Sequence, residues 1–220
     1  MCIRDSKETV ENLELVAATP SSALGSVRMK PTREDCEAIF NVLRRHNVKW
    51  FFYIGGNDSA ETVDIISRTA EEAGEDIVCF HIPKTIDNDL RENDHTPGFG
   101  SAARFVASAL IGDDLDSRAL GGVKIDIIMG RHAGWLTAAS MLSKGPDCDG
   151  PDLVYLPEVA FDPKDFMKRV KELAKKKHSI VIAVSEGVKL ADGRFVCELE
   201  GESGKLDAFG HKQLSGVGSY

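Results

Sequence analysis

The amino-acid sequence predicts an α/β fold in which mainly parallel strands are covered by helices. Short apolar runs alternate with amphipathic stretches along most of the 220 residues, which is the pattern of strand–helix–strand units. Glycine and other turn-forming residues follow the apolar runs, where strands are expected to end. With 42% apolar and 28% charged residues, the chain has the composition of an ordinary globular protein and can bury a substantial core.

The first half of the sequence predicts one helix followed by a complete βαβ unit. Thr32 is a suitable N-cap for the helix, and an apolar strand is expected at residues 48–54. Ser59 is expected to open the next helix, Gly74 to end it, and a second strand to follow at residues 77–82. The side chains predicted to face inward from the two helices are Ile39, Val42, Leu43, Val63, Ile66 and Ala70.

The alternation continues in the second half of the chain, where Trp135 and Leu136 are expected in the core. Beyond Gly187 the pattern weakens, and residues 1–6 carry no helix or strand pattern. We therefore expect the fold to be incomplete at both ends. In order, the elements predicted here are a helix at about 101–111, a strand at 125–129, a helix from Trp135, a strand at 153–156, a helix from Asp162 and a strand at 179–184.

Charge and cysteine content exclude several classes of protein. The formal net charge of −8 disfavours a partner such as nucleic acid or an anionic membrane, which would require a concentrated positive surface. No apolar run is long enough for a membrane span, so a cytoplasmic location is expected. The cysteines are scattered without metal-binding or disulfide spacing, which indicates reduced, structural thiols: Cys2, Cys36, Cys79, Cys148 and Cys197.

Polar or glycine-rich clusters follow four of the predicted strands. They are residues 55–59, 83–89, 129–134 and 185–187. In an open α/β sheet, ligands bind beyond the carboxyl ends of the strands. The four clusters are therefore the candidate binding site.

The first cluster combines two glycines with a carboxylate. Gly55 and Gly56 allow a close approach of backbone to ligand, and the amides that open the next helix favour an anion. Glycines are also used in such turns for steric reasons alone. Asp58 beside them is a metal ligand, a helix cap, or a group that repels part of a ligand.

The second cluster is denser. Asn88 and Asp89 are explained by turn formation, but Lys84 and Asp87 together are not. A lysine three residues from a carboxylate offers a phosphate contact next to a general base, which is the minimal equipment for phosphoryl transfer.

In their order along the chain, these clusters resemble the motif series of the phosphofructokinase family. The match runs from about Ser22 to the end, and its most specific part is the string Thr-Ile-Asp-Asn-Asp at residues 85–89. The further matching segments are Gly55-Gly56-Asn57-Asp58-Ser59, Pro83-Lys84, Met129-Gly130-Arg131, His132-Ala133-Gly134-Trp135, Pro157-Glu158, Ser185-Glu186-Gly187 and Gly210-His211.

The resemblance implies a fold of two Rossmann-like three-layer lobes with mainly parallel sheets. Residues 1–97 would form a phosphate-donor lobe that lacks its N-terminal glycine loop, with residues 206–220 returning to it. Residues 98–205 would form a sugar-phosphate-binding lobe. Relatives form dimers or tetramers, so a homo-oligomer is implied in the same way, and the fragment is expected to be inactive alone.

The resemblance also implies the chemistry, which is phosphorylation of fructose 6-phosphate at its 1-hydroxyl in glycolysis or its reversal. Asp87 would take the hydroxyl proton, Thr85 would orient that hydroxyl, and Lys84 would neutralise the departing phosphate. The residues implied in sugar-phosphate binding are Thr85, Asp87, Met129, Gly130, Arg131, Glu186, Lys205 and His211.

Two positions bear on the phosphate donor. ATP-using relatives carry glycine where this chain has Lys84 and usually glycine where it has Asp58, whereas pyrophosphate users carry lysine and aspartate. Asp58 would repel the α-phosphate of a nucleotide, which favours pyrophosphate. The residues implied in holding the donor phosphate are Gly55, Gly56, Ser59 and Arg28.

A magnesium ion is implied as the cofactor, with Asn57 and Asp58 as its candidate ligands. Asn57 stands where relatives commonly have aspartate, and a neutral amide oxygen binds a hard cation less strongly. Leu214 stands where many relatives have an arginine for the 6-phosphate, which shifts that contact towards His211 and Lys212.

Three alternatives remain at this stage. An ATP-dependent phosphofructokinase would need the matches at Asp58 and Lys84 to be misaligned. A non-catalytic regulatory subunit of the same fold is disfavoured by the retained Asp87. A kinase related to diacylglycerol or NAD kinases shares a similar donor turn, but it does not account for residues 83–89 or 129–131.

Overall fold

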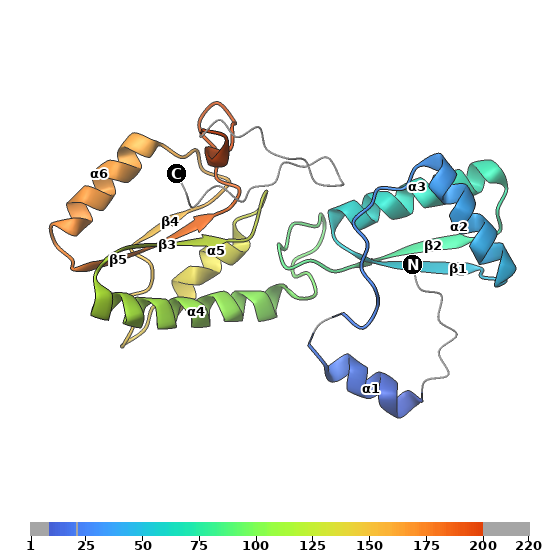
Figure 1. Cartoon of the computed structure of the whole chain (residues 1–220), viewed down its shortest axis with the longest axis horizontal. Helices are drawn as coiled ribbons and strands as arrows, with labels where there is room; N and C mark the ends of the chain where they lie inside the picture. The colour runs from blue at the N-terminus through green and yellow to red at the C-terminus, as the bar shows by residue number, and fades with distance from the viewer. Residues whose placement is uncertain (1–8, 21, 200–220) are drawn as a thin grey trace.

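The structure is a computed structural model that describes residues 9–20 and 22–199. Within these residues the strands form two separate parallel sheets (Figure 1). Strands β1 (Trp50–Gly55) and β2 (Val78–Pro83) form the first sheet. Strands β3 (Gly122–Ile128), β4 (Leu153–Tyr155) and β5 (Ser179–Ser185) form the second, in the order β3-β5-β4. The predicted α/β class with parallel sheets is therefore confirmed.

Two helices, α2 (Arg33–Arg45) and α3 (Asn57–Ala73), pack with the first sheet. Thr32 caps α2 as predicted, because its side chain accepts a hydrogen bond from the Asp35 amide while the Asp35 carboxylate accepts one from the Thr32 amide. Helix α3 ends at Gly74, which has the left-handed backbone expected of a helix stop. Because β1 and β2 are parallel and α3 connects them, the predicted βαβ unit is confirmed.

The core of the first unit lies between these two helices and one face of the sheet. Cys36, Phe40 and Leu43 point inward from α2 at helical spacing, against Ile66 and Ala70 of α3. Val42 had been predicted to face inward, but it is exposed. The prediction was wrong because the buried face of α2 is formed by Cys36, Phe40 and Leu43, and Val42 lies beside this face rather than on it.

The opposite face of the first sheet carries a row of exposed apolar side chains. The pairing Trp50↔Val78, Phe52↔Phe80 and Ile54↔Ile82 places all six on one face, because alternate residues of a strand share a side. These side chains are between 41% and 66% exposed. Figure 1 shows α2 and α3 together on the other side of the sheet.

Helices pack on both faces of the second sheet. Helices α4 (Phe99–Leu120) and α5 (Trp135–Ala139) cover one face, where Val181 and Ala183 of β5 are buried. Helix α6 (Pro163–Ala174) packs on the other face, above Ile180, Ile182 and Val184. On the side of α6, Val123, Ile125 and Ile127 of β3 are nevertheless 40–48% exposed. This unit therefore has three layers, and β5 in its centre is almost entirely buried.

Helix α4 extends nine residues past the predicted end at residue 111 and stops at Leu120. The polar residues after Ile111 suggest that the helix ends there. The helix continues, and two of the acidic residues in this stretch form ion pairs. Asp114 pairs with Arg118 one helical turn away, and Asp113 pairs with Lys124 of β3. Gly121, with a positive φ, follows the true end of the helix.

The side chain of Leu136 is buried as predicted, whereas Trp135 is 55% exposed and packs edge-on against Phe99. The prediction for Trp135 was wrong because it is the first residue of the short helix α5, on the side away from the sheet core. A helix that was not predicted, α1 (Val10–Ala18), precedes α2, and two short 3-10 helices, η1 (Ser140–Ser143) and η2 (Val196–Glu198), complete the elements. Among residues 9–20 and 22–199, no helix has the length and apolar character to cross a membrane.

Candidate active site

The turn after β1 brings the helix N-terminus of α3 to the edge of the first sheet. A Cβ atom on Gly55 would lie 2.0 Å from the Ser59 Oγ, so only glycine fits there. Gly56 is the N-cap, and α3 begins at Asn57 rather than at the predicted Ser59. Asn57 and Asp58 therefore lie in the first helical turn, where unpaired backbone amides and the helix dipole favour an anion.

The loop after β2 lies beside this turn. The Lys84 amide donates a hydrogen bond to the Gly55 carbonyl over 2.9 Å, which extends the pairing of the two strands. A Cβ on Gly56 would lie 3.5 Å from the Cβ of Thr85. The two clusters that were predicted to adjoin at the strand ends are thus in contact.

Asp87 has the environment of a general base. Its backbone amide donates to the Thr85 Oγ1 over 3.2 Å, and its Oδ1 is buried without a hydrogen-bond partner among the described residues. Burial raises the pKa of the Asp87 carboxyl, and the negative charges of Asp89 and Glu186 raise it further. Thr85 and Lys84 act in the opposite direction, by a hydrogen bond and by positive charge. The Asp87 carboxylate is therefore a stronger base than an ordinary aspartate.

Asp89, which the sequence had explained as a turn residue, is part of the same group of side chains. The Asn57 Nδ2 donates to the Asp89 Oδ2 over 2.7 Å. The other oxygen of Asp89, Oδ1, is buried without a hydrogen-bond partner in the described part of the chain. The sequence signal that could have identified Asp89 is its spacing two residues after Asp87.

The fit of this group to a magnesium ion rests on its oxygen atoms. The described residues contain no set of three or more histidine, cysteine, aspartate or glutamate side chains arranged as a metal site. Asp89 presents a buried carboxylate oxygen that has no hydrogen-bond partner among the described residues, the side-chain amide of Asn57 lies beside it, and Asp58 follows Asn57 in the first turn of α3. Magnesium binds through one or two carboxylates together with substrate phosphates and water, so these residues suit it.

The second sheet contributes residues from the ends of β3 and β5. The Ser185 hydroxyl donates to the Gly130 carbonyl over 2.6 Å, and the Gly130 amide donates to the Glu186 Oε1 over 3.2 Å. Gly130 has a φ of +136°, and a Cβ there would lie 2.4 Å from the Ala133 carbonyl oxygen. These contacts hold the Glu186 carboxylate beside the Met129–Arg131 segment, and the charge of Glu186 reaches Asp87.

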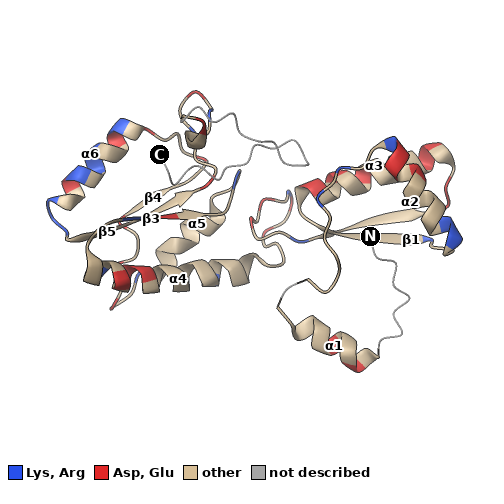
Figure 2. Ribbon diagram, in the orientation of Figure 1, with Lys and Arg blue, Asp and Glu red and all other residues tan. Residues whose placement is uncertain are grey.

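A groove of about 870 Å³ runs between the two units. Asn57, His81, Asp89 and Arg91 line it from the side of the first sheet, and His132 lines it from the side of the second. Figure 2 shows acidic residues on the loop that joins the two sheets. Of the predicted site residues that the structure describes, Asn57 lines this groove, and the groove is large enough for small phosphorylated ligands.

Not every predicted residue is brought into this group. Arg28 lies in an exposed segment before α2, at a position that no described contact joins to Asp87. Met129 is also exposed. Lys205 and His211 lie outside the described residues.

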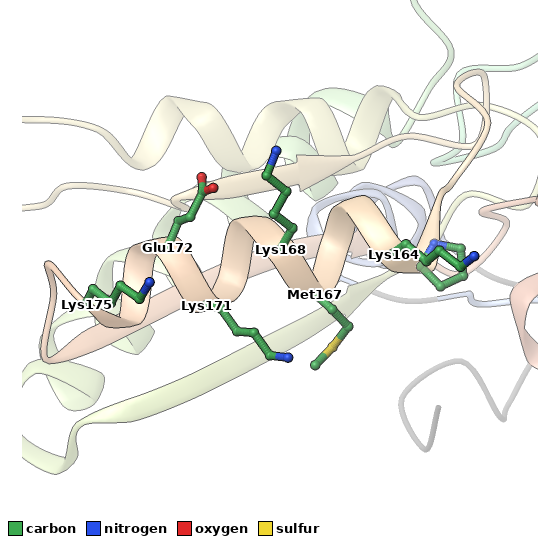
Figure 3. A pocket seen from close by; sticks show the side chains of 7 residues that line it. Lys164, Met167, Lys168, Lys171, Glu172 and Lys175 are labelled. Carbon is green, nitrogen blue, oxygen red and sulfur yellow. The ribbon is translucent and has the colours of Figure 1, made fainter.

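A second groove, of about 620 Å³, lies on the outer surface of α6 (Figure 3). Its lining comes from a single helix and the residue after it, and the four lysines Lys164, Lys168, Lys171 and Lys175 extend from it into solvent (Figure 3). None of the predicted site residues lines this groove. It is a solvated helix face.

Comparison with known proteins gives a consistent result. The family model "Phosphofructokinase" matches residues 3–220. The chain is 54% identical over 213 residues to a pyrophosphate–fructose 6-phosphate 1-phosphotransferase of Rhodospirillum rubrum, covering 97% of this chain and 53% of that protein. It is 42% identical to the protein of the same name from Xanthomonas campestris, covering 99% of this chain and 54% of the relative.

The solved structures agree with this result. The crystal structure of a pyrophosphate-dependent phosphofructokinase from Nitrosospira multiformis matches with a TM-score of 0.75 and 37% identity, over 86% of this chain and 48% of that one. The chain spans about half the length of the curated relatives it matches. Since the family model covers almost the whole sequence and the motifs occupy neighbouring strand ends, the chain belongs to the phosphofructokinase family.

Proposed function

We propose that the complete protein carrying this chain transfers a phosphoryl group from pyrophosphate to the 1-hydroxyl of fructose 6-phosphate, giving fructose 1,6-bisphosphate in a reversible reaction. The names of the similar proteins support this substrate pair. The single observation that carries the proposal is the half-buried Asp87 carboxylate, with a raised pKa, beside Lys84 and Glu186.

In the forward direction Asp87 accepts the proton of the sugar 1-hydroxyl as that oxygen attacks phosphorus. Thr85 orients the hydroxyl, a role that suits a side chain already hydrogen-bonded to the Asp87 amide. Lys84 neutralises the charge that develops on the departing phosphate. A preorganised contact of this kind is worth about 3 kcal/mol in the barrier.

The donor site is formed by the turn after β1. The glycines Gly55 and Gly56, the Ser59 hydroxyl and the first amides of α3 suit an anion, and Arg28 is proposed to reach the transferring phosphate. Asp58, in the first turn of α3, excludes ATP by repelling the α-phosphate of a nucleotide. Two like charges about 4 Å apart repel by about 4 kcal/mol at an effective dielectric constant near 20.

Fructose 6-phosphate is proposed to lie against Met129, Gly130 and Arg131, which directly precede the groove residues His132 and Ala133. Glu186 accepts hydrogen bonds from the sugar, with one of its oxygens already fixed by the Gly130 amide. Lys205 and His211 are proposed to contact the 6-phosphate on the basis of the motif resemblance. In this division, residues 1–97 form the donor lobe and 98–205 the sugar-phosphate lobe, with 206–220 returning to the first.

Magnesium is the proposed cofactor, held by Asp58 and by the adjoining Asn57 and Asp89 together with donor oxygens. When bound, it would neutralise negative charge on the phosphates. The hydrogen bond from Asn57 fixes one oxygen of Asp89 and leaves the other for a ligand. A cytoplasmic homodimer or homotetramer, acting in glycolysis or its reversal, completes the proposal.

Two further candidates share the fold. An ATP-dependent phosphofructokinase is disfavoured by Asp58 and Lys84, and a non-catalytic subunit is disfavoured by the retained and electrostatically perturbed Asp87. The donor and turnover measurements below separate these candidates from the proposal.

The proposed role of Asp87 is tested by Asp87→Asn in the complete protein. We expect turnover with fructose 6-phosphate and pyrophosphate to fall by about 10²-fold or more, because the amide cannot accept the proton. Thermal stability should change little. Asp94→Asn, the same change at an exposed carboxylate in the same loop, is the control and should leave turnover unchanged. Near-normal turnover in Asp87→Asn would remove Asp87 from the mechanism.

A further inference from the structure

The loop that carries Asp87 closes on itself through a buried threonine. Thr96 lies eleven residues after Thr85 and is only 1% exposed. Its hydroxyl donates a hydrogen bond to the Thr85 carbonyl over 2.6 Å. Its backbone amide donates to the Asn88 Oδ1 over 2.8 Å. Thr96 thus contacts the chain on both sides of Asp87, at the Thr85 backbone and at the Asn88 side chain.

The surrounding contacts make this closure rigid. Asn88 has a φ of +55° and is buried, and its Nδ2 donates to the Asp94 carbonyl over 3.3 Å. Thr85 also forms a parallel bridge with Gly98, the N-cap residue of α4. The Phe99 amide donates to the Thr96 carbonyl over 3.1 Å. The segment that bears Asp87 is therefore tied to the start of the helix that covers the second sheet.

We propose that Thr96 is a positioning residue, whose hydroxyl holds residues 85–87 in the conformation that aims the Asp87 carboxylate at the sugar hydroxyl. This inference rests on the proposed function of Asp87 as the general base. Thr96 belongs to none of the motifs that indicated the family, and it touches no proposed substrate position. Its effect on catalysis passes through the Thr85 carbonyl and the Asn88 side chain.

The role follows from the sensitivity of proton transfer to geometry. A base displaced by about 1 Å can lose about 10²-fold in rate. Replacing the Thr96 hydroxyl by a methyl group of similar size keeps the packing but leaves the buried Thr85 carbonyl unpaired. The loop then gains freedom at the residues that precede Asp87. Ground-state binding of the two substrates, which rests on other groups, should change much less.

The test compares Thr96→Val and Thr96→Ser in the complete protein, with fructose 6-phosphate and pyrophosphate. Thr96→Val should lower kcat by about 10-fold or more, with each KM within about 3-fold of the wild-type value. Thr96→Ser keeps the hydroxyl and should restore kcat to within about 3-fold. Asn88→Gly, which suits the positive φ but removes the acceptor for the Thr96 amide, should lower kcat in the same way and serves if Thr96→Val does not fold.

The matched control is Thr137→Val in α5. Thr137 is also fully buried, but its Oγ1 has no hydrogen-bond partner among the described residues, so the change removes no contact. It should leave kcat unchanged. If Thr96→Val loses thermal stability but keeps kcat, Thr96 is a purely structural residue and the proposal is overturned.

The separation of kcat from KM in Thr96→Val, together with its rescue in Thr96→Ser, distinguishes a positioning role from a purely structural one. Wild-type protein without phosphotransferase activity, or an active Asp87→Asn variant, would instead overturn the proposed function itself.

Discussion

At the scale of single residues, the site depends on which charges lie beside one carboxylate. Asp87 has two acidic neighbours that raise its pKa, Asp89 and Glu186, and one cation that lowers it, Lys84. Asp89 is close in the sequence, but Glu186 comes from the other sheet, almost one hundred residues away. The strength of the base is therefore set by the meeting of two units.

Asp87, Lys84 and Glu186 stood out in the sequence as candidates because each follows an apolar strand in a recognisable motif, and the structure brings their charges together. It did not predict the Asn57–Asp89 hydrogen bond or the buried Thr96, since both depend on how the loop after β2 folds back. Turn-forming residues are compatible with many loop conformations, and partners 8 or 32 residues apart leave no periodic signal in the sequence.

The choice of phosphate donor is proposed to depend on two single residues, Asp58 and Lys84. If Asp58 excludes ATP, Asp58→Gly should permit slow transfer from ATP, because the change removes both bulk and charge. Lys84→Gly should damage the pyrophosphate reaction more severely, and the double variant should favour ATP further without simple additivity. The test is to measure kcat/KM with pyrophosphate and with ATP for the wild type, the two single variants and the double variant. An ATP-inert Asp58→Gly variant with intact pyrophosphate turnover would make Asp58 an ordinary helix-start carboxylate.

A second residue-scale prediction concerns Asp126 of β3, outside the site. Burial, and the charge and hydrogen bond of the nearby Asp113, raise the pKa of Asp126 to about 6. Because the folded state holds this proton more tightly than the unfolded chain, its contribution to stability is present at low pH and is lost as pH rises from about 4 to 6.

Asp126→Asn should therefore raise Tm at pH 7 relative to the wild type and have little effect near pH 4. After allowance for solvent screening, the gain at pH 7 is on the order of 1 kcal/mol. Thermal unfolding of the two proteins between pH 4 and pH 8 gives the comparison. Equal Tm differences at both ends of this range would show that the Asp126 charge does not oppose folding.

At the level of secondary-structure elements, the turns that follow β1, β3 and β5 position the candidate site residues more than the helices do. The junction after β1 requires glycine because Ser59 lies against Gly55, and the junctions after β3 and β5 press directly on each other. Apolar periodicity located these junctions to within a few residues. It missed the full length of α4, whose charged end carries the Asp114–Arg118 pair within the helix and the Asp113–Lys124 pair with β3.

The turns after β3 and β5 contact each other at Arg131 and Gly187. A Cβ at Gly187 would lie 1.9 Å from the Arg131 carbonyl oxygen, and the neighbouring atoms are backbone as well. Gly187→Ala must therefore displace the segment proposed to bind sugar phosphate, and we expect a lower Tm and a raised KM for fructose 6-phosphate. Gly112→Ala, on the exposed face of α4 with no atom within 4 Å, is the control and should stabilise the protein. An unchanged KM in Gly187→Ala would separate the junction from substrate binding.

At the scale of the whole molecule, two α/β units face a common groove. The alternation of apolar runs and helices predicted the α/β class, because this pattern has few other solutions, whereas the two lobes were implied by the family resemblance. It could not predict which sheet faces remain exposed. One face of β1 and β2 carries apolar side chains but is exposed. The sequence pattern shows which side chains are apolar, but it does not show which elements pack against them.

We propose that the complete protein uses pyrophosphate rather than ATP to phosphorylate fructose 6-phosphate. The most direct measurement is kcat/KM of the wild-type protein for each donor at saturating fructose 6-phosphate and magnesium. We expect kcat/KM with pyrophosphate to exceed kcat/KM with ATP by about 10²-fold or more. A repulsion of several kcal/mol between Asp58 and the α-phosphate of ATP is sufficient for such a ratio. ATP used equally well, or no turnover with either donor, would contradict the account.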